Sequence, residues 1–149
     1  MNPEITLTAA QCDDLRAIAG LMIPASTEYG VPGADDPIIV ADILATLGRD
    51  AGMVRRALER LAELAGRPFA DLDAGQREEF AARFRASGDA AAATLARVVL
   101  QSYYRDDRVV RSLGLELRPP FPKGYTLEQG DWSLLDPVKT RPSMWRRAR

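Results

Sequence analysis

The sequence predicts an all-α fold, a compact bundle of about five to six helices followed by an extended C-terminal arm rich in proline and aromatic residues. Three observations predict it. Apolar residues recur at three- and four-residue spacing up to residue 113. Capping residues and helix breakers separate these runs, and no run alternates convincingly with a period of two. At 149 residues the chain has the size of one domain that needs no disulfides.

The first predicted helix begins at Thr8 and ends before Pro24. Thr8 and Gln11 form a capping-box pattern, in which the hydroxyl accepts an amide of the first turn and the glutamine reaches back. Its apolar residues are Leu15, Ile18, Ala19 and Met22. Residues 24–36 contain the turn-forming pairs Tyr29-Gly30, Pro32-Gly33 and Asp35-Asp36, so we expect a loop there.

Two further helices are predicted from aspartates that precede apolar runs. Asp36 and Pro37 suit the N-cap and first positions of the second helix. Asp50 is expected to cap the third helix, which Gly66 ends. The expected buried residues are Ile39, Ile43, Leu44 and Leu47 in the second helix and Val54, Leu58, Leu61 and Leu64 in the third.

The remaining helices follow the same logic. Asp73 and Gln76 repeat the capping-box pattern and open a fourth helix. Asp89 begins the longest helix, and a short helix is expected over 107–113, with Gly114 as its stop. The expected apolar positions are Phe80 and Phe84 in the fourth helix and Leu95, Val99, Leu100 and Tyr103 in the fifth.

The predicted organisation is a helical core domain over 1–114 and an extended arm over 115–149. Half of the 10 prolines fall within the arm, which excludes a long helix there. The arm also carries aromatic residues, which disordered segments usually lack. Such an arm either lies across a partner protein or wraps back on its own helices, and composition leaves both open.

Composition limits the chemistry that the chain can perform. The sequence has no histidine, which excludes Ser-His and Cys-His nucleophile pairs and histidine-ligated haem or zinc. Cys12 is the single cysteine, and a small, partly buried side chain is the favoured interpretation. A net charge of −1 gives no indication of nucleic-acid binding. No apolar stretch reaches membrane-spanning length and the start lacks a secretory pattern, so a cytoplasmic location is expected.

The remaining motifs have structural explanations. Asp71–Gly75 lacks the glycine and the glutamate of a calcium loop, and a helix cap explains it better. The carboxylate pairs Asp35–Asp36 and Asp106–Asp107 favour caps and surface charges over acid–base catalysis. Residues 145–149 are basic, and a solvated tail is favoured over a nucleic-acid contact. We therefore expect no catalytic, cofactor or metal site in this chain.

Several segments in order resemble the gluconate 2-dehydrogenase subunit 3 family. The N-terminal segments are Leu7–Gln11, Leu15, Ile18, Ile23–Pro24 and Gly33–Asp35. The later segments are Tyr103–Val109, Leu113–Gly114 and Pro120–Tyr125. The similarity covers most of residues 7–125, and each motif by itself is only moderately specific.

The resemblance implies an accessory role. Members of this family are small, non-catalytic subunits that pair with a large FAD-binding oxidoreductase of the glucose–methanol–choline type, acting on a sugar or alcohol. Many carry a twin-arginine export signal, which this sequence lacks, so a cytoplasmic hetero-oligomer acting on a sugar, glycoside or other alcohol is expected. FAD would then belong to the partner subunit, with no nucleic acid and no membrane span involved. The predicted partner-interface residues are Arg118, Pro120, Phe121, Tyr125, Trp132, Arg141 and Trp145.

Two other functional classes stay open from the sequence. One is a stand-alone helical domain that binds a small molecule, using Asp106, Asp107 and the neighbouring tyrosines. The other is a nucleic-acid-associated regulator that uses the basic C-terminal tail, against which the acidic N-terminal half counts.

Overall fold

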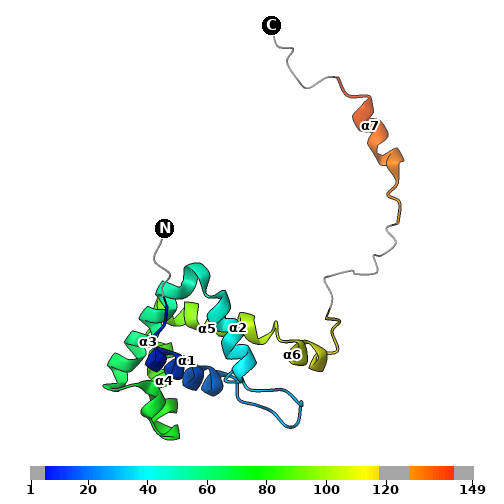
Figure 1. The fold of residues 1–149 in the computed structure, drawn as a ribbon. Helices are drawn as coiled ribbons and strands as arrows, with labels where there is room; N and C mark the ends of the chain where they lie inside the picture. Colours follow the sequence, from blue (N-terminus) through cyan, green and yellow to red (C-terminus); the bar gives the residue numbers. More distant parts are fainter. Residues whose placement is uncertain (1–5, 118–127, 143–149) are drawn as a thin grey trace. The chain divides into compact units, whose positions relative to one another are not determined.

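A computed structural model describes residues 6–117 and 128–142 of the chain, which divides into two units, Met1–Leu117 and Arg118–Arg149. Within the described residues every regular element is helical, and the all-α prediction is confirmed (Figure 1). The first unit contains α1 (Ala9–Met22), α2 (Pro37–Thr46), η1 (Gly48–Asp50), α3 (Ala51–Ala65), η2 (Phe69–Asp71), α4 (Ala74–Ala86), α5 (Ala90–Tyr103) and α6 (Asp107–Ser112). The second contains η3 (Trp132–Leu135) and α7 (Asp136–Lys139).

Most helix starts form as their capping residues predict. The Thr8 hydroxyl accepts the Gln11 amide at 3.2 Å, and the Gln11 side chain accepts the Thr8 amide at 3.0 Å. Asp73 and Gln76 make the same reciprocal pair at the start of α4. The carboxylates of Asp36, Asp89 and Asp106 cap α2, α5 and α6. At its other end α3 stops at Gly66, whose φ of 71° suits glycine.

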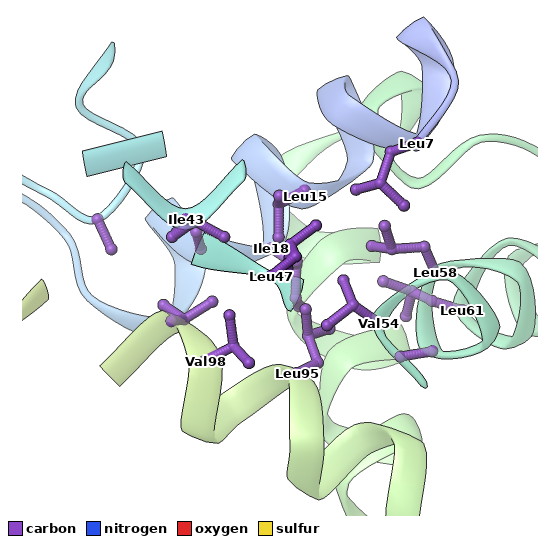
Figure 2. Packing of buried hydrophobic residues seen from close by; sticks show 14 of the residues in the cluster. Leu7, Leu15, Ile18, Ile43, Leu47, Val54, Leu58, Leu61, Leu95 and Val98 are labelled. Atoms are coloured by element: carbon purple, nitrogen blue, oxygen red, sulfur yellow. The ribbon is translucent and has the colours of Figure 1, made fainter. Parts of the chain in front are cut away.

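The core lies where α1, α4 and α5 pack against α3. Figure 2 shows side chains from α1, α2, α3 and α5 converging on one apolar cluster. The largest fully buried side chains are Phe69, Leu15, Ile39, Ile43, Leu58, Leu61, Val54 and Val99. Burying this set accounts for the cohesion of the first unit, because each such side chain contributes about 1.5–3 kcal/mol relative to exposure.

Three details of the predicted helices are wrong. Asp50 does not cap α3: its φ and ψ are helical, because η1 leads directly into α3, and its carboxylate instead binds Arg97 at 2.9 Å. Leu44 and Leu100 are exposed, 37% and 41%, instead of buried. The buried neighbours on those helices include Val40 and Val98. Leu64, expected in the buried stripe of α3, is only partly buried.

The 3₁₀ turn η2 is an element that sequence periodicity did not predict. It holds Phe69, which is 0% exposed and packs against α1. The carboxylate of Asp14 on α1 accepts the Ala70 amide at 2.8 Å and so fixes the turn. A three-residue turn has no period to detect, and only its tertiary contacts hold it in place.

The second unit is described over residues 128–142. An extended arm was expected here, but Trp132–Lys139 is helical. Asp131 starts this helical segment by accepting the Ser133 amide at 3.0 Å. Pro137 lies in the first turn of α7, where its missing N–H is no loss. The prolines therefore limit the length of this helix without preventing it.

We expect Phe69→Ala to lower the free energy of unfolding by about 3–5 kcal/mol, because it leaves a cavity in the core. Phe80→Ala is the matched control, since Phe80 is only partly buried and contacts Arg83. Phe80→Ala should lower the free energy of unfolding by less than half as much. Urea unfolding followed by circular dichroism measures both, and equal losses would contradict the central role of η2.

Candidate functional site

Two of the predicted partner-interface residues, Trp132 and Arg141, lie in the described part of the chain. Trp132 is 67% exposed, and its indole N–H donates to the Gln129 side chain at 3.2 Å. Arg141 is exposed at the end of the helical segment. The other predicted residues lie outside the described residues, and they are Arg118, Pro120, Phe121, Tyr125 and Trp145.

The helical segment around Trp132 presents apolar side chains to its surroundings. The exposed side chains include Trp132, Leu134, Leu135 and Val138. Polar contacts stabilise the segment locally: the Ser133 hydroxyl and amide both donate to Asp131, which lowers the pKa of that carboxyl. Lys139 binds Asp136 at 2.8 Å. Aromatic and aliphatic groups held in this way are typical of residues that anchor one protein to another.

In the first unit, Arg108 joins two helix N-termini that are far apart in the sequence. Its guanidinium donates to both carboxylate oxygens of Asp36, at 2.9 and 3.0 Å. It also donates to both oxygens of Asp106, at 3.0 and 2.9 Å. The same two aspartates cap α2 and α6. Arg108 thus ties the start of α6 to the start of α2 through two bidentate pairs.

This arrangement fixes the charge of both aspartates. Hydrogen bonds from Arg108 hold the pKa of Asp36 and of Asp106 below the ordinary value. The same contacts raise the pKa of Arg108. A carboxylate of lowered pKa is a poor proton acceptor near neutral pH. The interpretation of Asp36 and Asp106 as caps is confirmed.

Two tyrosines lie next to this cluster, at the end of α5. The Tyr103 hydroxyl donates to the carbonyl of Pro32 in the 24–36 loop at 3.2 Å. Burial raises the pKa of Tyr103. Tyr104 meets Tyr103 edge to face, with ring centroids 5.3 Å apart, and is itself 55% exposed. The loop and the α5–α6 junction are therefore joined at Tyr103 as well as at Arg108.

The 24–36 loop leaves no room for a side chain at Gly33. A Cβ there would lie 2.9 Å from the Ala25 amide nitrogen and would collide with the Asp35 carboxylate. Gly20 on α1 packs against the same Asp35 side chain, where a Cβ would lie 2.9 Å from Cγ. The loop therefore needs glycine at both positions to lie this close to α1. Sequence reasoning placed Gly33 in a loop but did not detect this contact.

Asp14 is a buried carboxylate that sequence reasoning missed. Its side chain is 4% exposed, and burial raises its pKa despite the amide hydrogen bonds that it accepts from Ala70 and Phe69. Asp14 precedes the buried Ile18 by one helical turn, and this spacing on an apolar face was the available signal. It serves to position η2.

A groove of about 700 Å³ lies between α1, α4 and α5. Its walls are mainly small or apolar, and charged side chains from Glu78, Arg85 and Asp89 also line it. The apolar and small lining residues are Ile18, Leu21, Met22, Ala81, Ala82, Phe84, Gly88, Ala92, Ala93, Leu95 and Ala96. A groove of this size and polarity could accept a small apolar molecule or a side-chain cluster.

Among residues 6–117 and 128–142, no cluster of three carboxylate or thiol ligands could hold a metal ion. Over the same residues, no helix is both long enough and apolar enough to cross a bilayer. No protein-family model, no curated protein and no solved structure matches this chain. Tyr103 and Arg108 contact Pro32 and Asp36, the two residues that flank the segment Gly33–Asp35.

We expect Arg108→Gln to lower the free energy of unfolding by about 2 kcal/mol at pH 7, after allowing for the partial exposure of Arg108. Because the folded pKa values of Asp36 and Asp106 are lowered, their contribution is present above the unfolded pKa of about 4 and is lost as pH falls through the folded values. The difference in the free energy of unfolding between variant and wild type should therefore become smaller at acid pH. Arg111→Gln, which removes an exposed pair with Asp107, is the control and should cost at most about 0.5 kcal/mol. Urea titrations from pH 7 to pH 3 test this, and a gap independent of pH would contradict it.

Asp14→Asn should show the opposite pH dependence. The folded pKa of Asp14 is raised, so the folded state binds this proton more tightly than the unfolded state does. Wild-type stability therefore falls as pH rises from about 4 through the folded pKa, and the variant does not share that loss. Relative to wild type, the free energy of unfolding of the variant should therefore increase between pH 4 and pH 7. Urea unfolding measures this. A difference between variant and wild type that stays constant from pH 4 to pH 7 would contradict this prediction.

Proposed function

We propose that this chain is the non-catalytic accessory subunit of an FAD-dependent oxidoreductase complex acting on a sugar, glycoside or other alcohol. In this proposal it binds and stabilises the large catalytic flavoprotein subunit, which holds the FAD. The observation that carries the proposal is the set of exposed apolar side chains on Trp132–Lys139, headed by Trp132 at 67% exposure. A short helical segment that buries so little of its own apolar surface is suited to burial against another protein.

The resemblance to the gluconate 2-dehydrogenase subunit 3 family supplies the identity of the partner. It rests on short segments of sequence, one of which, Tyr103–Val109, contains the residues that contact Pro32 and Asp36. The polar chemistry of that region also favours a binding role, because Asp36 and Asp106 are engaged by Arg108 and have lowered pKa values. These groups stabilise the junction of α2 and α6.

A second candidate is a stand-alone domain that binds a small molecule. The groove between α1, α4 and α5 favours it, because its volume of about 700 Å³ falls within the range of ligand sites. This candidate predicts that the purified chain alone binds an apolar ligand, with protection of α4 and α5 against hydrogen exchange. It also predicts that a substitution such as Ala93→Asp, within the groove, abolishes that binding.

We expect the double variant Trp132→Ala/Leu134→Ala to lose the flavoprotein. The chain would be co-expressed with each large flavin-binding oxidoreductase encoded in the same genome and purified through a tag on this chain alone. Wild type should yield a yellow, stoichiometric complex, and the variant should retain less than about a tenth of the flavin absorbance, because aromatic anchors dominate interface energy. Glu128→Ala, an exposed polar position of the same unit, is the matched control and should retain the colour.

The outcomes separate the two candidates. A variant that retains the full flavin absorbance would contradict the role of the helical segment. A colourless, folded wild-type monomer would overturn the accessory-subunit proposal and leave the small-molecule candidate to be tested by ligand binding.

A further inference from the structure

The groove between α1, α4 and α5 is elongated, because each helix lines it with one stripe of residues. On α4, and on α5 counted from its cap, the lining positions recur every three or four residues over two turns, about 10 Å along each axis. The stripes are Ile18, Leu21 and Met22 on α1, Glu78, Ala81, Ala82 and Arg85 on α4, and Asp89, Ala92, Ala93 and Ala96 on α5. A linear molecule suits this shape better than a compact one.

The middle of the groove is apolar. Ile18, Phe84 and Leu95 line it and also belong to the buried core. Leu21 and Met22 line it while only partly buried. Between them the alanines of α4 and α5 leave space that larger side chains would fill. An alkyl chain bound here would remove its own apolar surface and that of Leu21 and Met22 from water.

The charged side chains of the groove lie at its two ends. Arg85 and Asp89 lie on either side of the turn between α4 and α5, and their opposite charges compensate one another. The Asp89 carboxylate also accepts the Ala91 amide at 2.8 Å. Glu78 is two turns before Arg85 on α4 and therefore lies at the other end. The net charge of the lining is −1, and it comes from Glu78.

Glu78 also differs from the other glutamates of α3 and α4. Those glutamates each pair with an arginine of their own helix, and the pairs are Glu59 with Arg55, Glu63 with Arg60, and Glu79 with Arg83. Within residues 6–117 and 128–142, Glu78 makes neither a hydrogen bond nor an ion pair. Its carboxylate is therefore available to a cation from outside the chain.

The opposite side of Glu78 does not neutralise it either. Glu78 also lines a second, more polar hollow of about 550 Å³ between α1 and α4. The other charged residues of that hollow are Asp13, Asp35, Arg16 and Arg77, two of each sign. One negative charge thus stays uncompensated at the Glu78 end of the groove.

We infer that the groove binds an amphiphilic amine, with the ammonium group at Glu78 and the alkyl chain along Ala81, Ala82 and Ala93 toward Arg85. A primary ammonium is charged at pH 7, as in lysine, and offers three donors to a carboxylate. A carboxylate head at the same end would be repelled. This inference rests on the second candidate function, whose ligand class it names, and it does not depend on the accessory-subunit proposal.

The test is calorimetric titration of the full chain at pH 7 with octylamine, octanol and octanoate, which share one tail and differ in head group. Octylamine should bind with a Kd at least about fivefold lower than octanoate, because attraction to Glu78 becomes repulsion, with octanol between them. Glu78→Gln should reduce the preference for octylamine over octanoate to less than about twofold and leave the Kd of octanol unchanged.

Two further variants complete the test. Glu79→Gln is the matched control, since Glu79 is the next residue of α4 but does not line the groove, and it should keep the wild-type preference. Ala82→Phe, at an exposed position that does line the groove, should weaken binding of all three probes because it fills part of the space.

The outcomes separate the claims. A preference for octylamine that Glu78→Gln removes and Glu79→Gln keeps supports the inference. Equal affinity for the three head groups, tighter binding of octanoate, or a preference that survives Glu78→Gln overturns the inference and leaves the second candidate function standing. A wild-type chain that binds none of the three probes overturns both. None of these titrations involves a flavoprotein, so the accessory-subunit proposal is tested separately.

Discussion

Arg108 connects α6 to the body of the first unit by using four hydrogen bonds to two carboxylates that each cap a helix. A helix of six residues such as α6 is unstable by itself, so its position depends on these contacts and on the burial of Val109. The start of α2 depends on the same guanidinium through Asp36. Because both aspartates are committed to backbone caps, any movement of Arg108 would disturb two helices at once.

Local features of the sequence were sufficient to predict α1 to α6, but not η2 or the helical segment Trp132–Lys139. Thr8, Asp36, Asp73, Asp89 and Asp106 all act as N-caps, because a cap is decided by residues within one turn. Burial was less predictable. Leu44 and Leu100 carry apolar side chains at helical spacing, yet the packing partner of each helix covers an adjacent stripe instead. Phe69 lies in a three-residue turn with no period, so its place at the centre of the core followed only from tertiary structure.

The candidate site was less accessible to sequence reasoning than the fold. Asp36 and Arg108 are 72 residues apart, and nothing in the spacing of either motif indicates the other. One member of each carboxylate pair, Asp36 and Asp106, caps a helix as predicted, but the arginine that the two share was not foreseen. Trp132 was predicted as an interface anchor from the proline- and aromatic-rich composition of its surroundings, and the helical conformation of that segment was not. Proline disrupts the interior of a helix but is tolerated in its first turn, where Pro137 lies.

The ion pairs of Arg105 and Arg108 lie on the same helices as exposed apolar side chains. A surface that keeps Tyr104 and Leu100 exposed must be held rigid if it is to bind a partner without a large ordering cost. Arg105 and Arg108 provide that rigidity by fixing the ends of α2, α5 and α6 relative to one another. These contacts leave neither arginine unpaired, and the two carboxylates around Arg108 give that cluster a net negative charge, which disfavours acidic competitors. Their net contribution to stability is modest because they are partly exposed. Their larger contribution is to fix the relative positions of α2, α5 and α6.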